Sequence, residues 1–314
     1  MSYLISHAPH IREQRTVPDL MKAVMLALLP ATIAGVIFFG LQALALIIVC
    51  TLTAVITEIV CLKLMKSTVP VNGGGAAITG LLLALCLPPS FPVIFAIIGS
   101  IFAIVIGKQL FGGLGYNIFN PALVGRAFLA AAFPVHMTTW VMPFAYRGVE
   151  AISSATPLAA MKFSQQSTSS LSLLFGNVGG CIGETSALLL LLGGIYLLWK
   201  KVINWQIPVS YLGTVAVFGG VFWLVNPAQF PSPIFQLLAG GLMLGAWFML
   251  TDLVTSPITK KGLWIFGVGA GLLVVIIRLF SGLPEGVMYS ILIMNAVVPL
   301  INRYTRPRIL GQKK

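Results

Sequence analysis

Ten apolar segments run almost end to end through the chain and leave little sequence for anything else. Each can form a helix across much or all of a hydrocarbon core about 30 Å thick, and Gly or Pro beside the shorter ones predicts tilted or broken helices. Of the 314 residues, 58% are hydrophobic and 8% are charged, a composition typical of polytopic membrane proteins. The predicted segments are residues 21–39, 43–64, 75–87, 91–106, 118–133, 185–199, 209–225, 234–255, 263–280 and 286–302.

The basic residues fall on one side of these segments. Fifteen of the 19 Lys and Arg residues lie around the start of the first segment or follow the second, fourth, sixth, eighth and tenth. Ten crossings would place all fifteen on one face, and the positive-inside rule makes that face cytoplasmic. We therefore expect both termini in the cytoplasm, residues 1–20 as an N-terminal segment and residues 303–314 as a basic tail.

Residues 135–184 form the longest stretch that is too polar for lipid. Backbone groups left unpaired in hydrocarbon cost several kcal/mol each, so this stretch must lie in water or line a cavity. Five crossings separate it from the cytoplasmic N-terminus, which predicts an extracytoplasmic loop. Within it, Thr156 precedes Pro157, a pair that favours extended backbone at Thr156 and is also typical of an ordinary turn.

The residues before Thr156 form a motif. Glu150-x-x-Ser153-Ser154-Ala155-Thr156 resembles the flavinylation motif of the RnfD/NqrB family, the membrane subunits of the Rnf and Na(+)-translocating NADH:quinone reductase complexes. In that family an FMN is joined through its phosphate to the final Thr. Glu150 stands here for the usual Asp, and Ser154 for the usual Gly. The resemblance implies a covalent FMN on Thr156, with Ser153, Ser154 and Ala155 beside it, attached by a flavin transferase outside the cytoplasm.

A second polar stretch, residues 107–128, lies at membrane depth, where polar side chains are usually functional. Asn117 and Asn120 are three positions apart and so share one face of a helix or turn. Neutral amides suit a hydroxyl-rich ligand such as riboflavin, although Asn before Pro is also the pattern of a helix N-cap. The stretch resembles the family segment beside a non-covalent riboflavin near the cytoplasmic side. The expected riboflavin site therefore contains Asn117, Asn120, Lys108 and Asp252, the last from a Thr-Asp element that the family shares.

Two acidic residues in or beside the apolar segments have alternative roles. Asp252 could instead cap a backbone break before Pro257 or pair with Lys260 or Lys261. Glu58, within the second segment, is the candidate for an ion or proton path.

The outer loop ends in a second family element. The sequence GCIGETS resembles the family's G-x-I-G-E-T-S, which implies that Gly183, Glu184 and Thr185 lie against the FMN. Arg147 and Lys162 are among the few basic residues expected on this side. They either balance the charge of the flavin phosphodiester or are solvated loop residues.

A weak internal repeat is present. NGGGAAITG at residues 72–80 echoes NVGGCIGET at residues 177–185, and each precedes a short apolar helix from opposite sides of the membrane. This favours two inverted five-helix repeats, residues 21–134 and 185–302, although a chain rich in Gly and Leu also produces such matches by chance. The predicted fold is an all-α, polytopic membrane protein with about ten transmembrane helices, some broken or short.

The resemblance covers nearly the whole chain and implies a function. It implies a multi-pass subunit of the prokaryotic cytoplasmic (inner) membrane that relays electrons between ferredoxin and NAD+ through FMN and riboflavin, in a complex that pumps Na+ or H+. The short N-terminal segment favours the Rnf branch, with partner subunits A, B, C, E and G, over the quinone-reductase branch. Ferredoxin and NADH would react on those partners, since no nicotinamide-binding glycine motif follows a strand here. A secondary transporter or channel is the alternative from another class.

Two other classes of site are not expected. The four cysteines are scattered without a C-x-x-C pair or a His partner, which argues against an iron–sulfur or other metal site in this chain. The net charge of +12 follows the sidedness of the apolar segments, so it does not indicate nucleic-acid binding.

Overall fold

The computed structural model describes residues 16–66, 74–147, 155–184, 186–227 and 229–307, and within these ranges it is helical, without strands. The helices of the first part are α1 (Val17–Phe39), α2 (Leu41–Leu64), α3 (Gly75–Leu85), α4 (Val93–Val105), η2 (Gln109–Phe111), α5 (Pro121–Ala132), α6 (Pro134–Met137) and η3 (Ala145–Arg147). Those that follow are α7 (Pro157–Ser164), α8 (Ser170–Phe175), η4 (Ile182–Glu184), α9 (Ala187–Trp199), α10 (Gln206–Val225), α11 (Pro233–Leu238), α12 (Leu242–Leu244), η5 (Gly245–Met249), α13 (Lys260–Phe280) and α14 (Val287–Thr305).

In the described ranges, six helical segments are long and apolar enough to cross a membrane: α1, α2, α10, α13, α14 and the stretch Val93–Phe111 that contains α4. The helices α3, α5 and α9 are apolar but shorter. Each of these nine overlaps one of the ten ranges expected from the sequence, and the remaining range, 234–255, holds the short helices α11, α12 and η5. The all-helical fold is confirmed for the described residues, and the number of crossings stays a prediction.

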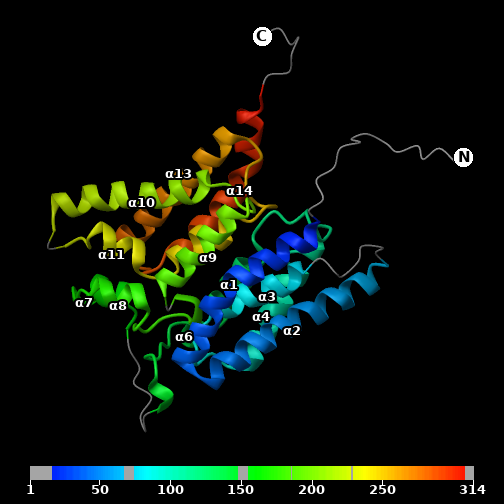
Figure 1. Ribbon diagram of the computed structural model, residues 1–314, viewed down its shortest axis with the longest axis horizontal. Helices are drawn as coiled ribbons and strands as arrows, with labels where there is room; N and C mark the ends of the chain where they lie inside the picture. The colour runs from blue at the N-terminus through cyan, green and yellow to red at the C-terminus, as the bar shows by residue number, and fades with distance from the viewer. Residues whose placement is uncertain (1–15, 67–73, 148–154, 185, 228, 308–314) are drawn as a thin grey trace, which may run out of the picture.

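The helices form two groups that follow each other along the chain (Figure 1). In the first group α2 packs against α3 and α4, and α4 packs against α5. In the second group α10 packs against α11 and α13, and α13 packs against α14. The helices α1 and α9 pack against each other between the groups, and one apolar core runs through both. The junction between the groups is therefore a continuous packed interface.

Much of the apolar surface of the first two helices faces outward. Only 28% of the most apolar 18 residues of α1, and 28% of those of α2, are buried. Large apolar side chains such as Ile33 and Leu52 are at least half exposed. An apolar surface of this extent needs lipid or another subunit to cover it.

The second group contains a break between α11 and α12. Ala239 is extended and Gly240 has φ +69°, a left-handed conformation that Gly adopts without steric cost. The guanidinium of Arg278 donates to the carbonyl oxygens of Gln236 at 2.6 Å and Ala239 at 2.9 Å. Arg278 thereby pairs backbone groups that the break would leave unsatisfied away from water.

After the break the chain makes a single π-helical turn, η5. The Leu250 N–H donates to the Gly245 carbonyl at 2.8 Å, a bond that spans five residues. Such turns are rare and occur frequently at functional sites. This one lies between the two candidate sites described next.

Candidate functional site

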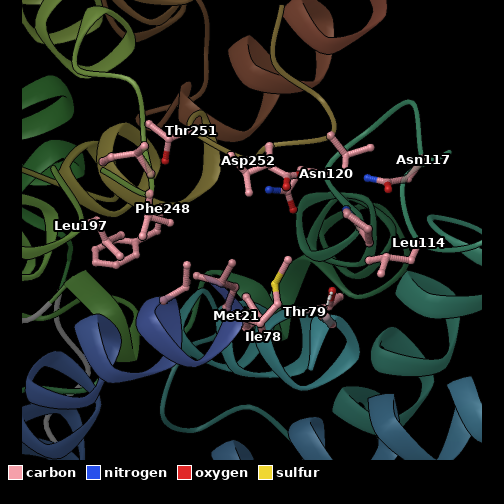
Figure 2. A pocket seen from close by; sticks show the side chains of 18 of the residues that line it. Met21, Ile78, Thr79, Leu114, Asn117, Asn120, Leu197, Phe248, Thr251 and Asp252 are labelled. Atoms are coloured by element: carbon pink, nitrogen blue, oxygen red, sulfur yellow. Dashed lines mark hydrogen bonds between the residues drawn. The ribbon is translucent and has the colours of Figure 1, made fainter. Parts of the chain in front are cut away.

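A cleft opens at the junction of the two helix groups, and it contains all four residues predicted to bind riboflavin (Figure 2). It holds about 750 Å³ of empty space including its mouth, within the range of small-molecule pockets. Asn117, Asn120, Lys108 and Asp252 line it together with mainly apolar side chains. The sequence did not identify the rest of the lining, which includes Met21, Ile78, Thr79, Leu114, Leu197, Trp247, Phe248 and Thr251.

Asn120 has a structural role in this cleft. Its side-chain oxygen accepts from the N–H groups of Ala122 and Leu123 at 3.1 and 3.4 Å, so it caps α5, and Pro121 occupies the first turn. Its amide nitrogen donates to the Met249 carbonyl at 3.2 Å. The capping role considered from the sequence is therefore confirmed. An amide NH2 carries two donors, so one remains for a ligand.

Asn117 and Asp252 approach the cleft from two different loops. The Asn117 amide nitrogen donates to the Phe119 carbonyl at 3.2 Å, and within the described part of the chain its side-chain oxygen accepts no hydrogen bond. Asp252 accepts from the Thr255 hydroxyl at 3.2 Å. These two side chains and Asn120 combine amide and carboxylate groups on one wall of a mainly apolar cleft (Figure 2).

Lys108 is ion-paired with Glu58 of α2. Both side chains are buried, and Gln109 also donates to the same Glu58 oxygen, at 3.3 Å. A buried charge is stable only when paired, which explains why these residues from distant segments meet. The sequence assigned Glu58 to an ion path and Lys108 to riboflavin, whereas the structure brings the two together at one edge of the cleft.

A second set of predicted residues lies around Thr156. The backbone of Thr156 is extended, with φ −64° and ψ 153°, as expected before Pro157, and its hydroxyl oxygen accepts from the Ala159 N–H at 3.2 Å to cap α7. Ala155 is exposed. Glu150, Ser153, Ser154, Thr185 and the side chain of Arg147 lie outside the described part of the chain.

Two side chains of α7 fix its position over the break between α11 and α12. Leu158 packs directly on Gly240, where an added Cβ would lie 2.6 Å from the Leu158 Cδ1 atom. Lys162 donates to the carbonyl oxygens of Arg278 at 2.7 Å and Leu283 at 2.9 Å, and also to that of Ser281. Lys162 therefore caps the end of α13, where a cation is favoured, and is not a solvated loop charge.

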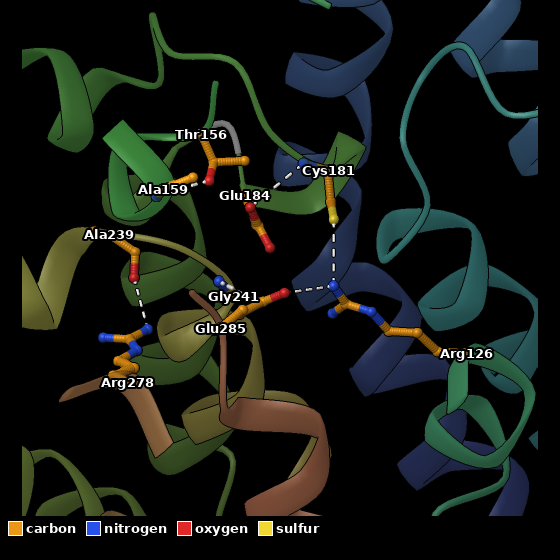
Figure 3. A network of polar contacts seen from close by, with 9 residues as sticks. All are labelled: Arg126, Thr156, Ala159, Cys181, Glu184, Ala239, Gly241, Arg278 and Glu285. Atoms are coloured by element: carbon orange, nitrogen blue, oxygen red, sulfur yellow. Dashed lines mark hydrogen bonds and ion pairs between the residues drawn. The ribbon is translucent and has the colours of Figure 1, made fainter. Parts of the chain in front are cut away.

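Beside this break, a polar network links the two helix groups (Figure 3). Arg126 of α5 donates to the Glu285 carboxylate at 2.6 Å and contacts the Cys181 sulfur at 3.6 Å. The other Glu285 oxygen accepts from the Gly241 N–H at 3.2 Å, and Glu184 accepts from the Cys181 N–H at 3.4 Å. In Figure 3 the Glu184 carboxyl points toward Glu285 and Gly241.

Arg126 and Glu285 were not predicted from the sequence, but a signal for them existed. Arg126, Arg147, Lys162 and Arg278 are the four basic residues outside the one-sided distribution. Among them, Arg126 and Arg278 are buried, and each pairs with groups from a distant segment. A basic residue that breaks the membrane charge pattern is thus a useful marker of a buried polar network.

The cleft and the network are connected through shared helices. Met21 of α1 lines the cleft, and Gly35, fourteen residues or about 21 Å further along α1, packs against Ile182 of η4. Along α5, Asn120 at the cleft and Arg126 in the network are only six residues, or about 9 Å, apart. The two sites are therefore joined by rigid helical backbone.

The chain has full-length relatives among known proteins. A sequence model described as the NQR2, RnfD, RnfE family matches residues 4–311. The chain is 46% identical over 322 residues to the D subunit of the proton-translocating ferredoxin:NAD(+) oxidoreductase complex of Clostridium ljungdahlii, an alignment that covers 99% of this chain and 97% of that protein. It is 46% identical over 319 residues to the D subunit of the Na(+)-translocating ferredoxin:NAD(+) oxidoreductase complex of Acetobacterium woodii, covering 100% and 97%. The D subunit of the ion-translocating oxidoreductase complex of Salmonella typhi is 39% identical over 351 residues, with both chains fully covered.

Proposed function

The chain belongs to the NQR2, RnfD, RnfE family, and from this premise we propose that it is the D subunit of an ion-translocating ferredoxin:NAD(+) oxidoreductase complex. The observation that carries the proposal is 46% identity, over essentially the full length, to two proteins with that name. Full-length relatives of this kind support an electron-transfer subunit over a secondary transporter and over the quinone-reductase branch. The complex, with ferredoxin and NAD(+) handled on its other subunits, is the enzyme.

The names of the relatives do not agree on the pumped ion. One is named proton-translocating and the other Na(+)-translocating, and both are 46% identical to this chain. The outward apolar faces of α1 and α2 are suitable for other membrane subunits of such a complex.

The first cofactor of the proposal is an FMN joined through its phosphate to the hydroxyl of Thr156. This hydroxyl stands at the first turn of α7, where the positive end of the helix dipole favours a negatively charged phosphate. Its oxygen accepts one hydrogen bond, and the described residues offer its proton no acceptor. The FMN would supply one-electron and two-electron redox chemistry at this position.

Mass spectrometry of the protein purified from its own membrane tests this assignment. The peptide that follows Arg147 and ends at Lys162 should carry the added mass of FMN less one water, with fragmentation that places it on Thr156. An unmodified peptide in an active complex would contradict the assignment.

The second cofactor of the proposal is riboflavin in the cleft. The amides of Asn117 and Asn120, the Asp252 carboxylate and the Thr251 and Thr79 hydroxyls offer donors and acceptors to a hydroxyl-rich chain. The side chains of Trp247 and Phe248 are suitable for contact with a flat ring. Among the described residues, Lys108, which is paired with Glu58, is the only basic residue that lines the cleft, and this favours a ligand without a phosphate.

Substitution of Asn120 separates its capping role from ligand binding. Asn120→Ser keeps a good N-cap for α5 but removes the amide, whereas Asn120→Leu removes both. We expect both variants to lose at least tenfold in affinity for dissociable flavin, measured by fluorescence of released flavin, with the covalent flavin unchanged. Full riboflavin binding by Asn120→Ser would show that Asn120 only caps the helix.

The proposal includes ten crossings in two inverted five-helix repeats. The matching packing order in the two groups supports it, and in this order the broken segment of α11, α12 and η5 takes the place of α3.

With ten crossings, both termini are cytoplasmic and Thr156 is extracytoplasmic. A cysteine introduced by Thr156→Cys should react with a membrane-impermeant maleimide in intact spheroplasts, and one introduced by Tyr304→Cys, at the exposed end of α14, should react only after lysis. The reverse pattern would contradict this orientation.

A further inference from the structure

The hydrogen bonds around Glu184 and Glu285 are unequal. Both oxygens of Glu285 have donors, one from Arg126 at 2.6 Å and one from the Gly241 N–H at 3.2 Å. Glu184 accepts one long bond, from the Cys181 N–H at 3.4 Å. Its other oxygen, Oε1, is fully buried and has no hydrogen-bond partner among the residues that the structure describes. A buried carboxylate oxygen without a donor costs the full desolvation penalty of that atom.

The unpartnered oxygen faces the neighbouring carboxyl. A Cβ built on Gly241 would lie 2.9 Å from Glu285 Oε1 and 3.2 Å from Glu184 Oε1, so both oxygens converge on the space above this glycine. The two carboxyl groups therefore face each other across this space. Two ionised carboxylates have no donor between them, and one proton on Glu184 supplies it.

The other charged and titratable groups around the pair do not supply a hydrogen-bond donor to the unpartnered Glu184 oxygen. Arg126 is already bonded to Glu285. The described bonds of Arg278, the second nearby cation, are donated to the carbonyl oxygens of Gln236 and Ala239. The Cys86 and Cys181 thiols are buried beside Arg126 and are neutral, weak partners.

The electrostatic environment assigns the proton to one of the two acids. Burial, followed by the negative charge of Glu285, raises the pKa of the Glu184 carboxyl above its ordinary value. Burial also opposes ionisation of Glu285, but the charges of Arg126 and Arg278, together with the Glu184 carboxyl and the Gly241 N–H, outweigh burial, so the pKa of Glu285 is lowered. Near neutral pH, Glu184 is therefore the neutral member and Glu285 the charged one.

We propose that Glu184 and Glu285 form a proton-binding site, in which Glu184 carries one exchangeable proton and donates it to Glu285 beside Arg126. When the site takes up a proton, an O–H bond of hydronium breaks and an O–H bond forms on the Glu184 carboxylate. No atom changes its oxidation state. The side chain of Glu285 is 20% exposed, so the site is open to exchange with the aqueous side. Because Arg126 and the Gly241 segment come from different helix groups, a change in this proton acts on the junction between them.

The position of the pair links its proton to the charge of a neighbouring redox group. Leu158, two residues after Thr156, packs on Gly240, next to the glycine where both carboxyls converge. If Thr156 carries a flavin, as the proposed function holds, an electron added there increases the negative charge near Glu184 and raises its affinity for a proton. This linkage rests on the proposed function, whereas the proton site itself does not.

Infrared difference spectroscopy during a pH titration of the purified complex tests the site. We expect a carboxylic-acid carbonyl band at neutral pH that disappears reversibly at alkaline pH. Glu184→Gln keeps the shape of the side chain and can still donate to Glu285, so the fold should persist while this band is absent at every pH. The control Asp19→Asn changes an exposed acid at the start of α1 and should leave the band unchanged. A wild-type protein without the band, or Glu184→Gln with it, would overturn the proposal.

Two further measurements test whether the bound ion is a proton and whether the site is independent of the flavin. Replacement of KCl by NaCl at constant pH should leave the carboxylic-acid band in place. Loss of the band in NaCl would make the pair a metal-cation site and overturn the proton assignment. The band should also persist in Thr156→Ala. A wild-type protein that lacks covalent flavin but keeps the Glu184 band would refute the cofactor proposal alone. A wild-type protein that carries covalent flavin but lacks the band would refute the proton site alone.

Thermal unfolding gives a second readout of the same variant. A carboxyl with a raised pKa stabilises the folded state at low pH, and this contribution is lost as pH rises through the folded-state pKa. The wild type should therefore lose more apparent Tm than Glu184→Gln as pH rises from the ordinary pKa of a glutamate to the raised pKa of Glu184, that is, from mildly acidic to mildly alkaline pH. Parallel curves for the two proteins would contradict a neutral Glu184.

Discussion

Thr156→Ala is expected to abolish the covalent flavin completely. The proposed bond is a phosphoester on the threonine hydroxyl, and alanine offers no oxygen to replace it. After denaturing electrophoresis, the wild-type band should fluoresce under ultraviolet light and the Thr156→Ala band should be at background, at equal protein load. The measurement needs a host that contains the flavin transferase.

Two companion variants separate the hydroxyl from the helix cap. Thr156 also caps α7, and loss of a cap alone costs about 1 kcal/mol. Thr156→Asn preserves a strong N-cap but has no hydroxyl, so its band should be as non-fluorescent as that of the alanine variant. Thr156→Ser keeps both features and should retain fluorescence. A fluorescent band in Thr156→Asn would place the flavin on another residue.

Much of the fold follows from the sequence because its dominant constraint is local. Apolar length and composition decide where a membrane helix forms, and the helices α1, α2, α10, α13 and α14 lie within a few residues of the predicted ranges. The range 234–255 was predicted as one segment. There the conformation of Gly240, and the pairing of freed carbonyls by Arg278 from another helix, produce a break that apolar length does not reveal.

The candidate sites differ in how far the sequence could predict them. Asn117 and Asn120 are close in sequence, so their spacing predicted a common surface, and Asp252 joined them through a family motif. The pairing of Lys108 with Glu58 spans 50 residues, and that of Arg126 with Glu285 spans 159. Contacts at such separations depend on how helices pack, and a single sequence does not encode that packing locally.

The pairing of Arg126 with Glu285 leads to the second large effect. Arg126→Met removes the cation from a largely buried pair and leaves Glu285 charged at the junction of the helix groups. Breaking a buried pair costs about 3–5 kcal/mol, and the partial exposure of Glu285 favours the lower end, about 3 kcal/mol. For a chain of this size we expect the apparent Tm of the purified protein to fall by about 5 °C or more.

A double variant tests whether the unpaired charge causes the loss. Arg126→Met combined with Glu285→Gln leaves no buried charge in this pair, so it should recover most of the lost Tm, since neutral replacement of a buried pair is often tolerated. Arg303→Met, at an exposed arginine near the end of α14, should not shift the Tm. A double variant that is less stable than Arg126→Met would contradict this explanation. The fall in Tm would then come from lost packing around the aliphatic part of the Arg126 side chain, and not from the unpaired charge of Glu285.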